Sequence, residues 1–381
     1  SIQQMIDIAV SKPKRKLPSL ANNQLLLRSL NNPLWNRSLI AGYGDYKGIG
    51  QFTEMLAEGL PETSELPGFS RAEYIQSLKR TLSQYNSFDL FTWITPKGLR
   101  SQSNSYFSEV RSPLPKDTEP RDRLLSFLPS TIYGAITSRN FSRQWQWFVE
   151  ESKLDPTYKI FVEGLRIVSP MILGTDSGID IEKDIISWMD GEYAFVAFPS
   201  DLAPLKDIGV NLTMGMLIRT SKPDAANVAL DKVAKYIAKL GRDVIQVKKR
   251  QVGATLLTSF EFPDGKGEGK TQSVLAYGWR DRQTLMVTFG SDTAAAFIPT
   301  PKPSLGESDM FRDAIADMPQ PNFGYFYLDA NAIAKRVSEL VLLGLNPSAD
   351  DLDKSASTPE LKIIQSALNK LGGLVLSLIH I

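Results

Sequence analysis

Cysteine is absent from this sequence of 381 residues, and histidine occurs once, at His380. Without cysteine the chain can form no disulfide bond, thiolate metal site or thiol nucleophile. A single histidine leaves no material for a Ser-His-Asp triad or a His-rich metal site. The lack of disulfides does not fix the compartment, because a large core needs none in an oxidising space either. We therefore expect no cofactor, and a non-catalytic protein more readily than an enzyme.

Long apolar runs and an excess of charge of either sign are also missing. No run approaches the roughly 20 apolar residues that span a bilayer, and 43 Lys and Arg face 42 Asp and Glu. A nucleic-acid-binding protein usually carries a strong basic excess, so we expect no nucleic-acid partner. One short basic run could contact an anionic membrane surface, although a solvated linker fits it better. It comprises Lys12, Lys14, Arg15 and Lys16.

The composition itself is that of a globular protein, with 42% hydrophobic and 22% charged residues. Alternating and β-rich runs, joined by short polar turns, predict strands that pair antiparallel. An amphipathic helix is predicted over Lys222–Leu240, with Pro223 in its first turn and Gly241 after its end. This order of elements predicts an α+β fold. The clearest strands are expected at 192–198, 211–219, 254–262, 272–279 and 283–289.

Two distant segments, 24–45 and 310–329, follow one pattern: a helix, a proline stop, and a strand that ends in Tyr-x-Asp before another helix. Each aspartate, Asp45 or Asp329, stands at the joint between strand and helix. There its carboxylate can accept the N–H groups of the first helical turn, so we predict that both are N-caps. The shared pattern predicts repeated units of antiparallel sheet flanked by helices.

The repeat also predicts how the chain is divided. Both ends fall inside a unit, so we expect the native chain to continue beyond them. Strands, a helix and an apolar segment of about 20 residues would precede Ser1, and a strand would follow Leu378. The predicted parts are the second half of a first repeat unit at 1–112, a linker at 113–128, the core of a second unit at 129–345, a mobile loop at 346–359, and a terminal helix and strand at 360–381.

Two glycine-rich stretches resemble nucleotide-binding loops. Residues 42–48 read G-x-G-x-x-x-G between a strand and a helix, as a dinucleotide site requires, but the second copy has no glycine at 326–332. A joint between repeat elements therefore fits 42–48 better. Residues 264–271 resemble a Walker loop, but Asp264 stands where that loop needs glycine and no helix follows. We predict a flexible hairpin loop there.

The densest acidic cluster lies within 176–192. Its spacing departs from the twelve-residue EF-hand loop and lacks the turn glycine of that loop. A helix from about Ile179 to Met189 would place Asp180 and Asp184 on one face and apolar side chains on another. Capping and a solvated face fit this pattern best, and a weak cation site at Asp180 and Asp184 is the alternative. The cluster comprises Asp176, Asp180, Glu182, Asp184, Asp190 and Glu192.

Aromatic residues gather in a predicted helix that runs to about residue 151. Phe141, Trp145 and Phe148 recur at the spacing of a core-facing stripe. Trp147 lies off that stripe. It could be exposed and contact a partner, but partial burial at the edge of the stripe fits the spacing better.

Residues 178–192 read G-x-D-x-x-x-D-I-x-x-W-x-x-G-E. This pattern resembles the motif of an uncharacterised, mainly cyanobacterial family known as a domain of unknown function (family 3352). The likeness extends over roughly 129–337 and includes 222–226 and 283–293. Members typically carry one N-terminal hydrophobic anchor or signal. The resemblance therefore implies a membrane-associated repeat protein in the periplasm or thylakoid lumen, and it implies no activity and no functional residues.

We expect a binding or scaffold protein outside the cytoplasm whose partner is another protein, with a membrane complex as one option. A flat apolar patch would favour this reading. One alternative is a carrier of an apolar ligand or lipid, which requires a large interior cavity. The other is a metal-dependent enzyme that uses the acidic cluster 176–192, which requires carboxylates converging on an ion at Asp180 and Asp184.

Overall fold

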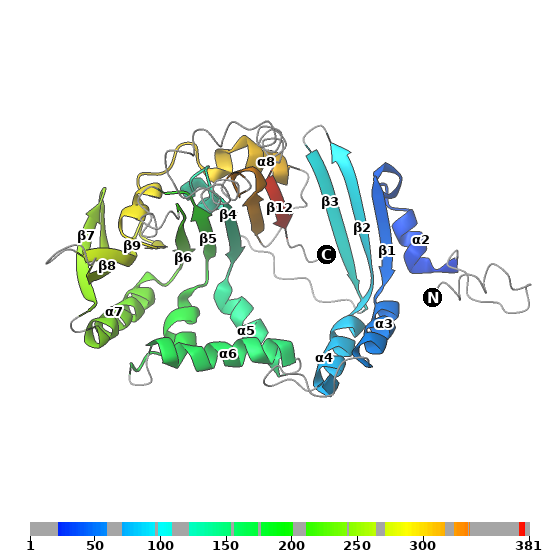
Figure 1. Ribbon diagram of the computed structural model, residues 1–381, viewed down its shortest axis with the longest axis horizontal. Helices are drawn as coiled ribbons and strands as arrows, with labels where there is room; N and C mark the ends of the chain where they lie inside the picture. The colour runs from blue at the N-terminus through cyan, green and yellow to red at the C-terminus, as the bar shows by residue number, and fades with distance from the viewer. Residues whose placement is uncertain are drawn as a thin grey trace, which may run out of the picture. The chain divides into compact units, whose positions relative to one another are not determined.

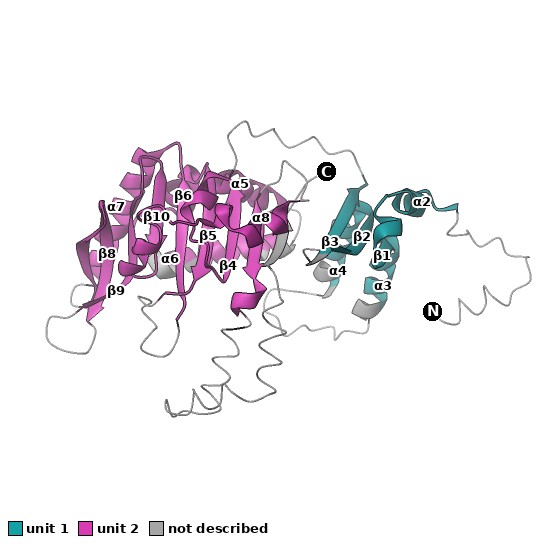
Figure 2. Ribbon diagram, turned by 90° about the horizontal axis from the view of Figure 1, so that it is seen from above, with its two compact units in different colours: residues 1–113, 381 teal, residues 114–380 magenta. Residues whose placement is uncertain are grey.

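The computed structural model divides the chain into two compact units (Figure 2). Unit 1 comprises residues 1–113 together with 381, and unit 2 comprises residues 114–380. Each unit is described by itself. The residues that the structure describes are 22–58, 71–95, 98–108, 122–153, 156–173, 177–200, 211–241, 244–263, 271–316, 324–333, 335 and 373–377.

Unit 1 contains a three-stranded antiparallel sheet in the order β1-β2-β3 (Figure 1). Side chains alternate between the two faces of a strand. Ser29 of α2 contacts Asp89 of β2, whereas Tyr46 of α3 packs its ring 5.5 Å from that of Phe88. The helices α2 and α3 therefore contact opposite faces of β2. The elements are α2 (Gln24–Leu30), η2 (Trp35–Arg37), β1 (Ile40–Asp45), α3 (Tyr46–Glu58), α4 (Arg71–Ser83), β2 (Tyr85–Thr95) and β3 (Gly98–Phe107).

In unit 2 the described strands form one antiparallel sheet in the order β12-β11-β4-β5-β6-β10-β9-β8-β7. Its first half contains η3 (Arg123–Phe127), β4 (Gly134–Arg139), α5 (Phe141–Ser152), α6 (Pro156–Leu173), η4 (Ile181–Ile185), η5 (Ile186–Trp188), β5 (Glu192–Phe198) and β6 (Thr213–Arg219). The second half contains α7 (Pro223–Leu240), β7 (Gln246–Val252), β8 (Thr255–Pro263), β9 (Thr271–Trp279), β10 (Thr284–Thr288), η7 (Asp292–Ala296), η8 (Leu305–Glu307), α8 (Asp309–Ile315), β11 (Tyr325–Asp329) and β12 (Gly373–Ser377).

Apolar side chains cover both faces of the sheet in unit 2. One face packs beneath the short helices η3, η7 and η8 and beneath α8, with Phe297 and Phe311 fully buried. The other face packs beneath α7, where Ala226 and Ala229 meet Leu285 of β10. Small alanines let the helix approach the sheet closely, and the two apolar layers supply the main stabilisation of the unit.

The antiparallel α+β fold predicted from the sequence is confirmed. The strands predicted at 192–198, 211–219, 254–262, 272–279 and 283–289 correspond to β5, β6, β8, β9 and β10, and the helix predicted over 222–240 corresponds to α7.

Two local expectations differ from the structure. The end of the predicted linker, 113–128, is part of the core, because Leu124, Leu125 and Leu128 pack into the apolar layer beside η3. The helix predicted from about Ile179 is a π-helical turn, η4, followed by the short 3-10 turn η5.

Candidate functional site

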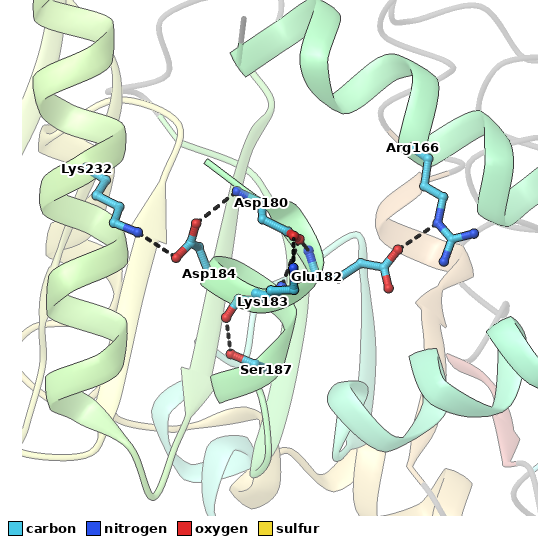
Figure 3. Close-up of polar contacts among 7 residues, drawn as sticks. All are labelled: Arg166, Asp180, Glu182, Lys183, Asp184, Ser187 and Lys232. Carbon is cyan, nitrogen blue, oxygen red and sulfur yellow. Dashed lines mark hydrogen bonds and ion pairs between the residues drawn. The ribbon is translucent and has the colours of Figure 1, made fainter. Parts of the chain in front are cut away.

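The segment that carries the family-like motif begins with a capped turn (Figure 3). The carboxylate of Asp180 accepts hydrogen bonds from the backbone N–H groups of Glu182 and Lys183, at 3.0 and 3.1 Å. Its other oxygen lies 3.0 Å from the Lys183 ammonium. These contacts hold the pKa of Asp180 below its usual value, chiefly through the Lys183 N–H. Asp180 therefore acts as the N-cap of η4, the role that the sequence favoured.

Asp184 is held from two sides. One carboxylate oxygen pairs with Lys232 of α7 at 2.8 Å, and the other accepts the backbone N–H of Asp180 at 2.8 Å (Figure 3). The hydrogen bond from Lys232 lowers the pKa of Asp184 below its usual value. In addition, the indole N–H of the buried Trp188 donates to the Asp184 carbonyl at 2.8 Å. Asp184 thus ties the turn to α7 and to the core.

Glu182 points toward α6, where Arg166 donates to it at 2.7 Å (Figure 3). This contact lowers the pKa of Glu182. Asp180, Glu182 and Asp184 therefore contact different partners and do not converge on one point. Among the described residues, no group of three or more His, Cys, Asp or Glu side chains could hold a metal ion.

The last residues of the motif form hydrogen bonds with two other segments of unit 2, one at Ser221 and one at Asp122 to Leu124. Asp190 accepts hydrogen bonds from the backbone N–H and the hydroxyl of Ser221, at 2.9 and 2.5 Å. A Cβ on Gly191 would lie 2.6 Å from the carbonyl oxygen of Arg219, so this position requires glycine. The carboxylate of Glu192 accepts the N–H groups of Asp122 and Leu124, at 3.0 and 3.2 Å.

The buried side chain of Arg139 contacts two carboxylates, that of Glu192 at the end of the motif and that of Asp122. The Arg139 guanidinium lies 3.1 Å from the carboxylate of Asp122 and 3.8 Å from that of Glu192. Asp122 itself adopts a left-handed backbone conformation, with φ 66°. A cavity of about 10 Å³ beside these groups has room for about one water molecule. The motif residues described so far are thus joined to other parts of unit 2.

The two predicted caps lie where a strand passes into a helix. The carboxylate of Asp45 accepts the N–H of Lys47 at 2.9 Å, and that of Asp329 accepts the N–H of Ala332 at 2.8 Å. At the second glycine of the pattern 42–48, a Cβ on Gly44 would lie 2.0 Å from the ring of Phe88. Close packing against β2 thus explains this glycine without a nucleotide.

A polar cluster in unit 1 was not found from the sequence. The fully buried carboxylate of Asp89 accepts hydrogen bonds from the Ser29 hydroxyl, the Asn104 amide and the Tyr106 hydroxyl, at 3.2, 2.6 and 2.8 Å. The Arg28 guanidinium stacks 3.3 Å from the centre of the Tyr106 ring. Burial raises the pKa of Tyr106 to about 12. The run of polar residues from Arg100 to Ser105 in β3 was the available signal, but it does not identify their partners.

A second charged cluster lies near the edge of the sheet in unit 2. Glu261 of β8 is fully buried and binds Arg250 of β7 through two hydrogen bonds of 2.5 and 2.7 Å. Lys248 lies 3.4 Å away, and the hydroxyl of Thr271 also donates to this carboxylate. Arg250 is the main reason that the pKa of Glu261 falls to about 2. This cluster joins three neighbouring strands.

The hairpin of α5 and α6 carries aromatic side chains on its surface. The ring centre of Trp147 lies 5.2 Å from those of Phe148 and Tyr158, and Phe148 lies 5.3 Å from Phe161. Trp147 is 44% exposed and Phe161 is 51% exposed. Trp147 is therefore exposed while one side of its ring is packed. Trp145 is buried, and Phe141 and Phe148 pack beside it, as the stripe predicted.

We name Trp147, Tyr158 and Phe161 the α5–α6 aromatic surface. Ile167, which is 63% exposed, lies further along α6. A separate open hollow of about 680 Å³ lies beside Pro129 and 295–303, and its wall carries one charged residue, Lys302.

Some residues singled out in the sequence lie outside the described residues. They are the basic residues Lys12, Lys14, Arg15 and Lys16, the acidic residue Asp176, residues 264–270 of the Walker-like loop, and His380. Thr271, the last residue of that loop, begins β9. The strands β8 and β9 on either side of it pair antiparallel. No helix that the structure describes is long and apolar enough to cross a membrane.

Comparison with known proteins gives one result. No curated protein matches the chain, and no solved structure matches it. A family model described as "Protein of unknown function (DUF3352)" matches residues 60–359, which is well over half of the chain. The match includes the whole motif segment from Gly178 to Glu192. This chain belongs to that family of proteins of unknown function.

Proposed function

We propose that this protein is a non-catalytic binding protein that contacts another protein through the α5–α6 aromatic surface. The observation that supports the proposal most directly is the exposure of Trp147 and Phe161, whose rings both pack against Phe148 of this helical hairpin. Large apolar side chains scattered singly over a surface need no explanation, but a contiguous group marks a contact site.

The chemistry of this surface suits a protein partner. Trp and Tyr are enriched among the residues that dominate binding energy, because they bury a large area and lose little side-chain entropy. Tyr158 provides a hydroxyl, and the exposed charges of Glu163 and Arg166 on α6 form a salt bridge of 3.0 Å beside the apolar residues. An apolar centre with a polar rim is the usual anatomy of a protein interface.

Two finer points also belong to this proposal. We infer from the family likeness that the native protein works outside the cytoplasm, in association with a membrane, and that its fold consists of repeated units. The paired strand-to-helix joints at Asp45 and Asp329 support the repeat. Fractionation of cells that produce the native protein tests the location: recovery in the soluble cytoplasmic fraction contradicts it.

Site-specific crosslinking tests the binding proposal. A photo-reactive amino acid at Trp147 should crosslink one discrete protein in the native host. The same group at Ile94, an exposed position in unit 1, serves as the control. The crosslinked protein is then purified and titrated against the chain by calorimetry. Trp147→Ala should weaken its binding at least about tenfold, while circular dichroism and the unfolding midpoint show that the variant is folded.

Two outcomes contradict the proposal. One is crosslinking to lipid alone, which would make the aromatic surface a membrane contact. The other is equal binding by the wild type and the Trp147→Ala variant, which would remove this surface from the interface.

A further inference from the structure

Positive charge gathers in one short stretch of unit 2. Residues 232–250 contain seven Lys and Arg and one Asp, although the whole chain has a net charge of only +1. This stretch comprises the second half of α7, the turn after it and most of β7, the strand that ends the described sheet. The helix α7 and the strand β7 are in contact (Figure 1). The charge is therefore gathered in space as well as in the sequence.

Three of these cations have acidic partners within the fold. Lys232 pairs with Asp184 at 2.8 Å. Lys248 and Arg250 lie against the buried carboxylate of Glu261, at 3.4 and 2.5 Å, and their side chains are still 36% and 45% exposed. These three cations add to the positive field, but they also hold the structure together.

Three further lysines share the side of the sheet that α7 covers. Lys235 and Lys239 are exposed and stand about one helical turn apart, so they lie on one face of α7. Lys249 stands opposite Thr258, which stands opposite Tyr277, and the Tyr277 hydroxyl donates to a carbonyl of α7 at 3.3 Å. Directly opposed side chains point to the same face of a sheet. Lys249 donates to the uncharged hydroxyl of Thr258 at 2.8 Å, and this contact does not neutralise its charge.

Two exposed apolar side chains lie at the turn between α7 and β7. Leu240, which follows Lys239 directly, is 59% exposed, and Val244 is 56% exposed. The backbone N–H groups of Val244 and Ile245 both donate to the carbonyl of Gly241, at 2.6 and 2.8 Å, so the turn is tight. Apolar side chains are thus held at the same end of α7 as the lysines.

We propose that this part of unit 2 binds the anionic surface of a lipid membrane. The lysines would meet lipid phosphates, and the two apolar side chains would enter the boundary between head groups and acyl chains. The proposal rests on the charge and exposure of these residues, and not on the α5–α6 aromatic surface or on the location inferred above. We name the residues the α7–β7 basic surface: Lys235, Lys239, Leu240, Val244 and Lys249.

A lipid surface fits these residues better than a nucleic acid does. Sites for nucleic acids usually add aromatic rings that stack on bases, or arginines that read base edges. The α7–β7 basic surface contains neither an aromatic residue nor an arginine. A phosphate backbone offers no apolar partner for Leu240 and Val244, whereas the head-group boundary of a membrane does.

The charge also argues against a covering segment from this chain. The loop 264–270, which joins β8 and β9, contains two acidic and two basic residues, so its sequence carries no net charge to neutralise the lysines. It lies outside the described residues, as does the acidic stretch 350–353. If that acidic stretch covered the lysines, the full chain would bind anionic and neutral vesicles alike.

Sedimentation of the full chain with vesicles tests the proposal. The probes are vesicles of phosphatidylcholine and vesicles of an equal mixture of phosphatidylcholine and the anionic phosphatidylglycerol. The wild type should bind the mixed vesicles at least about tenfold more strongly than the neutral ones, and added salt should weaken this binding. Equal binding to the two kinds of vesicle would overturn the proposal.

Two double variants with the same net charge separate this surface from the charge of the whole chain. Lys235→Gln with Lys239→Gln should weaken binding to the mixed vesicles at least about tenfold. The matched control is Lys47→Gln with Lys302→Gln, at two other exposed positions, which should bind as the wild type does. Equal losses in the two double variants, with unchanged circular dichroism, would remove the α7–β7 basic surface from the contact.

The absence of cysteine allows a second measurement in the full chain. An environment-sensitive fluorophore attached at Val244→Cys should shift its emission to shorter wavelength when mixed vesicles are added. The same label at Ile94→Cys, a 69% exposed position in unit 1, should not respond. An unchanged spectrum at position 244 would overturn the proposal. So would retention of the chain on duplex DNA in the presence of excess mixed vesicles, because the partner would then be a nucleic acid.

Discussion

The two units use opposite chemistry beneath a helix that contacts the sheet. Beneath α2, in unit 1, the buried carboxylate of Asp89 gathers three hydrogen-bond donors. Beneath α8, in unit 2, the ring of Phe311 meets those of Tyr325 and Tyr327 edge to face, at 5.5 and 5.3 Å. Asp89 stands opposite Tyr43, whereas Val375 stands opposite Tyr327.

This difference shows that a helix can be held on a sheet in two ways. Unit 1 uses directional hydrogen bonds to Asp89, and unit 2 uses non-directional ring contacts of Phe311. A polar network specifies one geometry, but every member must stay paired, because an unpaired buried group is expensive. An aromatic cluster tolerates small shifts, but it loses stability in proportion to the volume removed. The predictions below use this contrast.

The largest effect is expected in unit 2. Phe311→Ala should lower the free energy of unfolding by about 3–5 kcal/mol, because it removes a fully buried ring and leaves a cavity. Urea denaturation measures the loss, and hydrogen exchange with mass spectrometry assigns it to unit 2. Phe161→Ala, at an exposed position, is the control. A loss below about 1 kcal/mol for Phe311→Ala would mean that the aromatic cluster does not hold α8.

In unit 1, Asp89→Ala should cost about 2–4 kcal/mol, because the hydroxyl, amide and phenol groups that it binds would stay buried without an acceptor. The same urea and exchange measurements apply. Asp89→Val makes the comparison sharper, since Val375 of β12 stands opposite Tyr327 as Asp89 stands opposite Tyr43. If Asp89→Val alone is as stable as the wild type, directional pairing does not hold unit 1 together.

Unit 2 also contains a buried carboxylate held by directional contacts, that of Glu261. Because the pKa of Glu261 in the folded protein lies near 2, below its unfolded value of about 4.5, the carboxylate stabilises the fold above about pH 4.5. This contribution, about 3 kcal/mol, is lost as the pH falls toward 2. Glu261→Gln should flatten this part of the curve of stability against pH. A wild-type curve that matches the variant between about pH 5 and 2 would contradict the role of Glu261.

The smallest effect on stability is expected at the two helix caps, Asp45 in unit 1 and Asp329 in unit 2. Asp45→Ala and Asp329→Ala each remove a carboxylate that accepts a helix N–H, so each should cost about 1 kcal/mol. Thermal unfolding of the two variants, compared with Asp45→Asn and Asp329→Asn, measures this. An asparagine variant that loses as much as the alanine variant would argue against a capping role.

Sequence patterns predicted the elements whose own residues carry a clear period. The strands β5, β6 and β8–β10 alternate or are rich in β-branched residues, and α7 has both a start and a stop signal. The strand β7 was not predicted because Gln, Lys and Arg fill it. Such residues suit a sheet edge but carry no strand pattern of their own.

The remaining features depend on contacts that are distant in the sequence. The π-helical turn at 181–185 forms where the Asp184 carboxylate accepts the N–H of Asp180 while Lys232 of α7 holds its other oxygen. The partners of Asp89 come from α2 and β3. In the candidate site, Trp147 could be singled out because it lies off the apolar stripe. Phe161 could not, since apolar residues outnumber charged ones along α6 and do not single it out.

The contacts of Glu192 with Asp122, Leu124 and Arg139 determine where an independently folding piece of this protein can begin. A fragment that started at Pro129 would keep every described strand of unit 2 but lose Leu124, Leu125 and Leu128 from the apolar layer. It would also leave Arg139 without Asp122, and Glu192 without the N–H groups that it binds. The folding boundary of unit 2 therefore lies at or before Asp122, inside what the proline-rich sequence marks as a connector.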